Sequence, residues 1–363
     1  MKKTVLNPKH VALGAKLIDF AGWEMPVQYA GIIEEHHAVR NAVGLFDIDH
    51  MGQIIVTGKD AASFLNYVMT CDVLSLPLNK ARYSLLCYAD GTIIDDTLVY
   101  HLGNRYMVVV NASNTDKAFA WFKYHLHGFE VHVENQSDAL CMLSLQGPRS
   151  EDVLRGLTPL DLNQIAYYAC AEGTVAGVQC VVARTGYTGE DGFELFFDVA
   201  KAEHVWDSLM QAGANCSLQP IGLGARDTLR FEAGMPLYGH EISDEINPLE
   251  ARLGWAVHLD KEFIGRDALL KVKLEGVKRQ IVGFELTGSG GSARQGFDIY
   301  AGDERIGFVA SGAFSPTFKK MLGSGFVAKP YAAPGTEISV MIRNKPVKGV
   351  IVERPFYKPK RKK

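Results

Sequence analysis

The strongest constraint on the fold is a run of three strand-like segments joined by two short turns. Residues 82–88, 92–101 and 105–111 are rich in β-branched and apolar residues, and Asp90-Gly91 and Gly103-Asn104 separate them. Turns built from glycine, aspartate and asparagine favour tight hairpins. Because hairpins join antiparallel neighbours, the pattern predicts an antiparallel meander with residues 92–101 as its middle strand.

Two adjacent carboxylates, Asp95 and Asp96, interrupt this middle strand. Side chains alternate along a strand, so Asp96 is expected on the face of Ile94, Leu98 and Tyr100, with Asp95 on the other face. Neither face is polar, and an ionised carboxylate among apolar side chains needs a partner or a raised pKa. The pattern alone leaves three explanations: an internal salt bridge, a carboxylate that caps a turn, or a carboxylate that serves a ligand.

Length and composition exclude several classes of function. A chain of 363 residues predicts two or three domains, and its 47% of hydrophobic residues is enough for their cores. A net charge of -3 argues against a broad nucleic-acid surface. No apolar run is long enough to span a bilayer, and the first residues lack the apolar stretch of a secretory signal. We therefore expect a soluble, cytoplasmic protein with small-molecule and protein partners, and neither nucleic acid nor membrane.

The cysteines and histidines do not predict a metal site. The six cysteines fall singly, with no C-x-x-C pair, so they are expected to be buried free thiols. His36 and His37 are adjacent, and neighbours on a helix point about 100° apart. They are expected on a helix surface.

The remaining pattern predicts an α+β fold with antiparallel sheets. After residue 275 the chain becomes all-β, which divides it into 1–275 and a small barrel or jelly roll over 276–363. Residues 288–293 fit G-x-G-x-x-A, but a strand pattern follows them, so a loop is expected. Ser113 and Asp116 resemble a helix capping pair. Helices are expected at 32–43, 60–69, 115–125, 202–212, 223–233 and 267–274.

A third carboxylate, Glu194, interrupts the apolar strand Phe193–Phe197, after a glycine-rich turn that contains Tyr187. A plain hairpin explains the glycines but not the carboxylate. On the predicted helix at 223–233, Arg226 and Arg230 lie one turn apart, so each is expected to have its own anionic partner. Surface pairing with Asp227 or Glu232 is the ordinary alternative.

Two further segments, 19–26 and 46–52, mix aromatic, acidic and glycine residues as binding loops do. Hydrophobic packing alone is an alternative explanation for Trp23 and Met51.

Together these segments resemble the aminomethyltransferase, or T-protein, family of the glycine cleavage system. The resemblance covers nearly the whole chain, and the order of the motifs is more specific than any one of them. They are DFAGWEMPVQY, EEHHAVRNAVGLFDIDHMG, GTIIDDTLVY, LQGP, TGYTGEDGFE, GLGARDTLRFEAGMPLYGHE, ASGAFSPT and LGSGFV.

The resemblance implies a three-lobed protein with two interleaved α+β lobes, a C-terminal β-barrel and a central folate channel. It implies that tetrahydrofolate, as co-substrate, accepts the carbon of an aminomethyl group held on a lipoylated carrier protein. Ammonia, 5,10-methylenetetrahydrofolate and the dihydrolipoyl carrier would be the products.

The resemblance also implies roles for single residues. Asp96 would be the catalytic carboxylate beside the folate's bridge nitrogen, and Glu194 would hold the pterin. Arg361 would match an arginine near the glutamate tail of folate. Asp49 and Ala293-Arg294 depart from the family pattern. The residues implied to line the folate channel are Arg226, Tyr187, Asn111, Tyr83 and Met51.

Three other functions fit the same scaffold. A folate-binding protein for iron-sulfur assembly would carry a K-G-C motif in the loop that here reads RTGYTGEDGFE. A demethylating oxidase needs a flavin-binding half, and the chain has no dinucleotide fingerprint. A transferase with sulfonium donors would be told apart by its donor.

Overall fold

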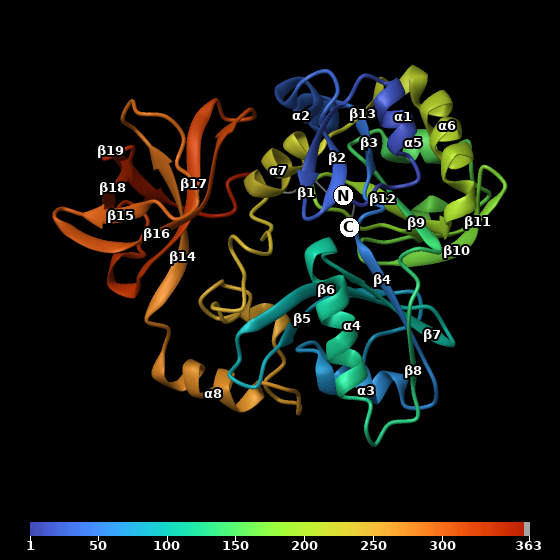
Figure 1. Cartoon of the computed structure of the whole chain (residues 1–363), viewed down its shortest axis with the longest axis horizontal. Coiled ribbons are helices and arrows are strands. Elements are labelled where there is room, and N and C mark those ends of the chain that lie inside the picture. The colour runs from blue at the N-terminus through green and yellow to red at the C-terminus, as the bar shows by residue number, and fades with distance from the viewer. Residues whose placement is uncertain (359–363) are drawn as a thin grey trace.

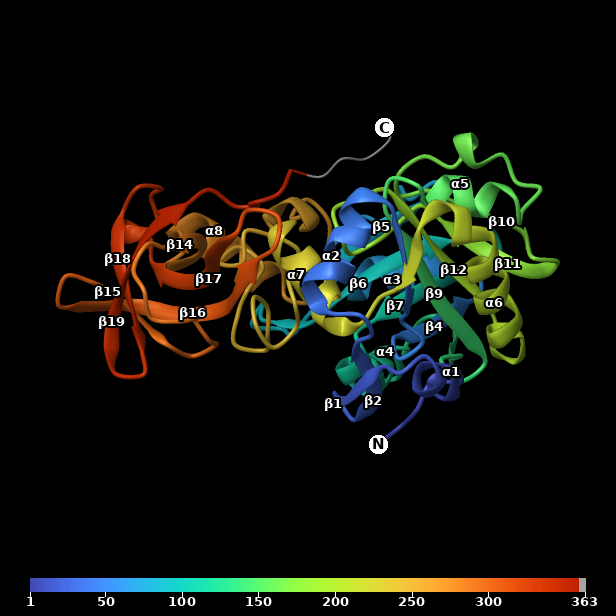
Figure 2. The ribbon, with the colours of Figure 1, turned by 90° about the horizontal axis from the view of Figure 1, so that it is seen from above.

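The computed structural model describes residues 1–358 and has three lobes. Two lobes, each built on an antiparallel or largely antiparallel sheet, lie together, and a closed barrel lies to their side (Figure 1). Seen from above, α7 (Leu223–Glu232) lies between the barrel and the other two lobes (Figure 2). The expected three-lobed α+β fold with a C-terminal barrel is confirmed. Arg361 lies outside the described residues.

The first sheet contains the predicted meander. Its strand order is β5-β6-β7-β4-β8, and every neighbouring pair is antiparallel. Apolar side chains on one face pack under two helices, with Phe64 and Phe122 fully buried. The elements are β4 (Gly52–Thr57), α3 (Ala61–Val68), β5 (Ala81–Cys87), β6 (Ile93–His101), β7 (Arg105–Val110), α4 (Thr115–Tyr124) and β8 (His132–Asn135).

A β-bulge changes the predicted facing of the first residues of β6. Leu86 pairs with Asp95, but Cys87 pairs with Ile93, so Ile94 is the extra residue. Ile94 therefore packs with the helix-side cluster and not on the face of Asp96. The sequence-based prediction for Ile94 is wrong because a bulge breaks the two-residue period of side-chain direction.

The second sheet has the order β10-β11-β12-β9-β3-β13. All its pairs are antiparallel except β13, which runs parallel to β3. Because β3 and β4 follow each other in the chain but join different sheets, the first two lobes interleave. The elements are β3 (Val43–Asp47), β9 (Leu140–Gln146), α5 (Ser150–Arg155), β10 (Cys170–Val175), β11 (Val178–Ala183), β12 (Gly192–Asp198), α6 (Ala202–Gly213) and β13 (Leu218–Pro220).

The predicted helices are all present, with ends within two residues of the prediction. The capping pair is not: the N-cap of α4 is Asn114, and no side chain caps it. The Asn114 amide instead donates to Asp95, which explains why it does not serve the helix. The other elements of these lobes are α1 (Asn7–Ala12), β1 (Lys16–Phe20), β2 (Trp23–Gln28), α2 (Ile32–Asn41) and α8 (Arg266–Glu275).

The third lobe is a closed barrel with the order β14-β17-β16-β15-β18-β19. The residues of the G-x-G-x-x-A match form a loop, as expected. At the hairpin between β18 and β19, Arg343 and Asn344 have φ of 50° and 62°, as a two-residue turn of this kind requires. The strands are β14 (Arg279–Leu286), β15 (Asp298–Ala301), β16 (Glu304–Ser315), β17 (Lys320–Ala328), β18 (Glu337–Ile342) and β19 (Lys345–Val352).

A buried polar network joins the barrel to the other lobes. His36 lies 2.9 Å from the Thr317 hydroxyl and 3.4 Å from Glu232. Glu232 also accepts hydrogen bonds from Ser315 and Thr317, and pairs with Arg40 at 3.2 Å. His36 has no exposed surface, so its predicted place on a helix surface is wrong: α2 is covered by α7 and the barrel.

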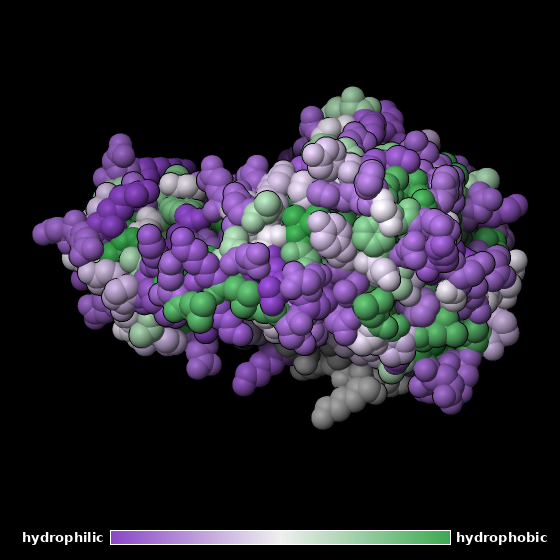
Figure 3. Space-filling model, turned by 90° about the horizontal axis from the view of Figure 1, so that it is seen from below, coloured by the Kyte–Doolittle hydropathy of each residue, from purple (hydrophilic) through white to green (hydrophobic). Residues whose placement is uncertain are grey.

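The outer surface offers no broad apolar face in the view from below. Hydrophilic residues dominate, and hydrophobic residues form separate groups between them (Figure 3). No helix within residues 1–358 combines the length and apolarity needed to span a membrane. The six cysteines are free and buried, as predicted.

Candidate active site

Asp95 and Asp96 are held by one asparagine. Asn111 Nδ2 donates to Asp95 Oδ1 at 2.7 Å and to Asp96 Oδ1 at 2.6 Å. The Asn111 backbone N–H and Asn114 Nδ2 also donate to Asp95, at 3.0 and 2.6 Å. Within the described residues neither carboxylate forms a salt bridge, so that explanation is wrong, and amide hydrogen bonds satisfy the pair instead.

The two carboxylates differ in access. Asp95 is fully buried under α4, whereas Asp96 is half-buried on the face that meets the second sheet. Tyr83 donates its hydroxyl to Asp96 Oδ2 at 3.0 Å. Burial raises the pKa of both groups, and the neighbouring charge of Asp96 raises the pKa of Asp95 further. Asp96 is therefore the member of the pair that a ligand can reach.

Glu194 lies on β12, with 4% of its surface exposed. Thr185 and Tyr100 donate hydroxyl hydrogen bonds to it, and both bonds end on Oε2. Burial raises the pKa of Glu194, while the Thr185 hydrogen bond and the charge of Arg226 oppose that rise. Among the described side chains, Oε1 has no donor, so this oxygen is free for a ligand.

Arg226 has no hydrogen-bonding carboxylate among the described residues. Its guanidinium lies 4.6 Å from the centre of the Tyr187 ring, a cation–π contact. Burial lowers the pKa of Arg226, and Tyr187 and Glu194 partly offset that effect. The predicted anionic partner of Arg226 is thus absent from the described chain.

Arg230, one turn further along α7, has the partners that Arg226 lacks. It pairs with Glu241 at 2.7 Å and with Asp227 at 2.7 Å. The prediction that each arginine has its own anionic partner is therefore confirmed for Arg230, whose buried partner is Glu241. Arg230 also makes the surface pair with Asp227 that was the ordinary alternative. Glu232 belongs to the network around His36 instead.

The remaining predicted residues line the space between the two sheets. Met51 packs at the edge of the apolar cluster that contains Tyr100 and Tyr168. The Tyr187 hydroxyl donates to the Pro236 carbonyl, which fixes its ring beside Arg226. Tyr187 is also near enough to Asp96 for that carboxylate to help raise the Tyr187 pKa, after burial as the main cause.

Sequence reasoning missed a guanidinium at the same channel. Arg354 has two buried nitrogens, Nε and Nη2, without a hydrogen-bond partner among the described residues. Burial lowers its pKa, and Glu241, Arg230, Tyr187 and Arg252 are the charges around it. A buried, unpartnered guanidinium is costly and is accounted for when a ligand supplies the anion.

Asp49, a departure from the family pattern, is buried beside the site. It accepts a hydrogen bond from the Met142 N–H at 3.2 Å. Burial, followed by the nearby charge of Asp47, raises the pKa of Asp49 to about 7. Burial and Arg226 lower the pKa of the adjacent His50 to about 4.

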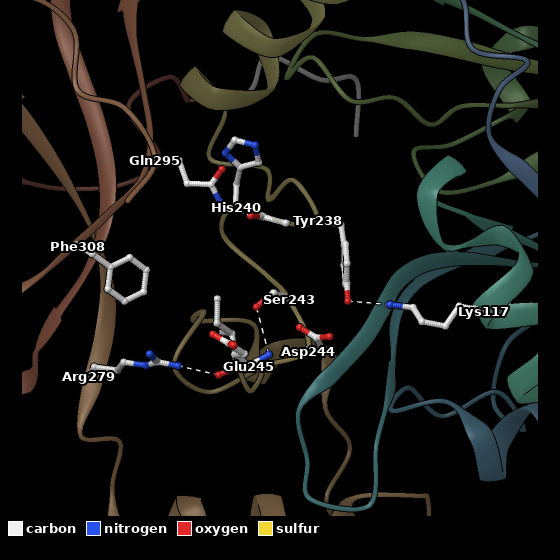
Figure 4. A pocket seen from close by; sticks show the side chains of 11 residues that line it. Lys117, Tyr238, His240, Ser243, Asp244, Glu245, Arg279, Gln295 and Phe308 are labelled. Atoms are coloured by element: carbon white, nitrogen blue, oxygen red, sulfur yellow. Dashed lines mark hydrogen bonds between the residues drawn. The ribbon is translucent and has the colours of Figure 1, made fainter. Parts of the chain in front are cut away.

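A cavity of about 430 Å³ contains none of the predicted site residues. It lies between α4, the segment 238–246 and the barrel, and Lys117 donates to the Tyr238 hydroxyl at its rim (Figure 4). Two of its cations have partners in the chain: Arg279 pairs with Glu250 at 3.1 Å, and Lys117 donates to Tyr238. The candidate site is the set of residues around Asp96, because the sequence-predicted side chains lie there and not in this cavity.

Comparison with known proteins gives one match for the first two lobes and a second match for the barrel. Residues 6–261 match the sequence model of the GCVT N-terminal domain, and residues 279–358 match the glycine cleavage T-protein C-terminal barrel domain. The chain belongs to the glycine cleavage T-protein family. The predicted activity of the chain as an aminomethyltransferase is confirmed by the full-length relatives described next.

Relatives of this T-protein family match over nearly their full length. The aminomethyltransferase of Caldanaerobacter subterraneus subsp. tengcongensis is 50% identical, over 100% of this chain and 98% of its own. That of Desulfitobacterium hafniense strain DCB-2 is 49% identical, over 99% and 98%. The crystal structure of glycine cleavage system aminomethyltransferase T from Bartonella henselae is 34% identical, with a TM-score of 0.92 over 99% and 98% of the two chains.

Proposed function

We propose that the channel transfers the carbon of a lipoyl-bound aminomethyl group to tetrahydrofolate. The carbon–sulfur bond and the carbon–nitrogen bond to the amine break, and two new bonds join the carbon to the folate nitrogens. The two protons that leave those nitrogens go to the thiolate and to the departing amine. Ammonia, 5,10-methylenetetrahydrofolate and the dihydrolipoyl carrier result, so atoms balance without an oxidant.

The observation that supports this proposal is the pair of incompletely partnered polar groups on Glu194 and Arg226. Glu194 Oε1 lacks a donor among the described side chains, and Arg226 lacks a carboxylate. A carboxylate suits the two parallel N–H groups on the amidine-like edge of a pterin. We assign Glu194 and Arg226 to the pterin, and Tyr187, Asn111, Tyr83 and Met51 to the channel wall.

Asp96 is assigned to the reacting centre. Its half-buried carboxylate can accept a hydrogen bond from the folate's bridge nitrogen, and it can stabilise the positive charge that develops as ammonia leaves. A low-dielectric setting strengthens that interaction. Asn111 and Tyr83 hold both carboxylate oxygens, so little reorganisation is needed during the reaction.

The tail of the acceptor is assigned to Arg354. The carboxylates of a folate glutamate tail are anions of the kind that this buried guanidinium lacks. Arg361, the arginine that the sequence suggested for this role, lies outside the described residues. A lipoylated carrier and folate are the proposed partners, and a cytoplasmic location stays a prediction.

The division into residues 1–275 and 276–363 is also proposed. It is supported by the end of α8 at Glu275 and the start of the first barrel strand at Arg279. Residues 254–275 still pack against the first sheet, because Thr70 donates to the Ala256 carbonyl at 2.9 Å.

The test uses the purified protein with an aminomethylated lipoyl carrier, with and without tetrahydrofolate. We expect ammonia and 5,10-methylenetetrahydrofolate to form in equal amounts only when tetrahydrofolate is present. Methyl transfer to tetrahydrofolate from a sulfonium donor, with no reaction of the aminomethylated carrier, would instead support the transferase that uses sulfonium donors. Folate binding without release from either donor would overturn the transfer assignment.

A further inference from the structure

One aromatic side chain that stacks on Tyr83 is largely exposed to solvent. Trp255 lies on the short turn η5 (Gly254–Ala256), and 66% of its surface is exposed. Tryptophan is usually largely buried, as Trp206 is here at 1%. An exposed indole gains free energy when an apolar group covers it.

The indole is coupled to the catalytic carboxylate through one side chain. The rings of Trp255 and Tyr83 stack, with centroids 5.2 Å apart and planes at 28°. The Tyr83 hydroxyl donates to Asp96 at 3.0 Å. Tyr83 lies on β5, the edge strand of its sheet, so this pair lies at the margin of that sheet.

The exposure of Trp255 is not that of a loose loop. The Ala256 carbonyl accepts a hydrogen bond from Thr70, and the His258 N–H donates to the Thr70 carbonyl, both at 2.9 Å. Leu253 and Ala256, on either side, are buried. The turn is therefore anchored, and it holds the indole outward.

We propose that Trp255 is the platform for the acyl chain of the lipoyl arm. This inference rests on the proposed function. The donor arm is a straight hydrocarbon chain with its sulfurs at the far end, and it must bring the sulfur-bound carbon to Asp96. With the acceptor between Glu194 and Arg354, a chain lying on Trp255 reaches the carboxylate past Tyr83. The indole binds the chain, and Tyr83 orients Asp96.

An exposed apolar residue by itself needs no explanation. Leu274 on α8, for example, is 86% exposed. Trp255 differs because its ring contacts Tyr83, which in turn contacts Asp96. Leu274 therefore serves as the matched control for the loss of exposed apolar surface.

The test runs the reaction in reverse, from 5,10-methylenetetrahydrofolate, ammonia and a dithiol. The carbon leaves the two folate nitrogens and joins sulfur and nitrogen, while the thiol and ammonia protons move to the folate. Two dithiols are compared: dihydrolipoamide, which has the acyl chain, and 1,3-propanedithiol, which does not. The variants are Trp255→Ala, Trp255→Phe and Leu274→Ala, with the tetrahydrofolate Kd and thermal unfolding measured alongside.

We expect Trp255→Ala to lower kcat/KM for dihydrolipoamide about tenfold, which corresponds to loss of about two buried methylene groups. The rate with 1,3-propanedithiol, the tetrahydrofolate Kd and the unfolding temperature should not change. Trp255→Phe should restore most of the rate, and Leu274→Ala should behave as wild type.

Two outcomes overturn the platform. Equal losses with both dithiols would show that Trp255 only supports Tyr83. An unchanged rate with dihydrolipoamide would show that the indole is ordinary surface. If the wild-type protein makes no tetrahydrofolate from either dithiol, the proposed function itself fails, and this inference fails with it.

Discussion

The Asn111 side-chain amide bridges the two carboxylates of β6, with Nδ2 2.6 Å from Asp96 Oδ1 and 2.7 Å from Asp95 Oδ1. This bridge allows adjacent aspartates to lie in a largely apolar strand without a cation. Asp95 is satisfied by amides alone and stays buried, which leaves Asp96 to present its carboxylate to the channel. The Asn111 hydrogen bonds that stabilise the two carboxylates therefore also leave Asp96 as the one that can meet a ligand.

Asp96→Asn should lower kcat at least about a hundredfold, because the neutral amide cannot stabilise the developing positive charge. Ammonia release from the aminomethylated carrier measures the effect. The fold should persist, since the change removes a buried negative charge beside Asp95. Asp90→Asn, in the exposed turn before the same strand, is the control and should keep full activity. Near-normal turnover in Asp96→Asn would contradict the assigned role.

Glu194→Gln should weaken tetrahydrofolate binding about tenfold, because a charge-assisted hydrogen bond to the ligand becomes a neutral one. Isothermal titration measures the Kd. The matched control is Glu172→Gln, on the edge strand β10 of the same sheet, where the carboxylate is exposed and pairs with Arg105. An equal change in both variants would count against the pterin assignment.

The pH dependence of kcat should have an acidic limb above the ordinary carboxyl range of about 4. Burial raises the pKa of Asp96, and the reaction needs its ionised form, so activity should rise with pH through that raised value. The Tyr83 hydrogen bond lowers the pKa of Asp96, so Tyr83→Phe should move the limb to higher pH. A limb that stays in place in Tyr83→Phe would show that Asp96 does not set it. Tyr88→Phe, just beyond the same strand, is the control.

Asp49→Asn should stabilise the protein at pH 8 by roughly 1–3 kcal/mol, and much less at pH 4. The folded-state pKa of Asp49 is raised to about 7, above the value of about 3.9 expected in the unfolded chain. Between these two pKa values Asp49 is ionised in the unfolded chain but protonated in the folded one, so the free energy of unfolding falls as pH rises. Above pH 7 Asp49 is ionised in both states, and the loss of stability no longer changes with pH. Urea unfolding at both pH values measures it, with exposed Asp138→Asn as control. An equal effect at both pH values would contradict the buried-charge explanation.

Arg354→Met should weaken binding of tetrahydrofolate but not of a tetrahydropteroate that lacks the glutamate. The reason is that a buried guanidinium without a partner gains most from a ligand carboxylate. Titrations with the two ligands give the comparison. Arg343→Met, in the exposed hairpin turn at the far side of the barrel, is the control. Equal losses for both ligands would place Arg354 away from the tail.

The sequence alone was enough to predict most of the elements and to single out several candidate residues. Alternation and turn residues predicted the meander, the barrel hairpins and six helices, because these signals are local. Asp96 and Glu194 stood out because a carboxylate in an apolar strand is costly wherever the strand lies. The motif order was specific enough to indicate the family.

Only the tertiary structure decided how those residues are used. The bulge at Ile94, the burial of His36 and the partners of Arg226 and Arg230 depend on contacts between segments far apart in the chain. Arg354 carried no local signal, because an arginine before Pro355 looks like any surface cation until its nitrogens are found buried. Trp255 likewise stood out only once its ring was seen against Tyr83. These features depend on packing between distant segments, and a short stretch of sequence holds no information about such contacts.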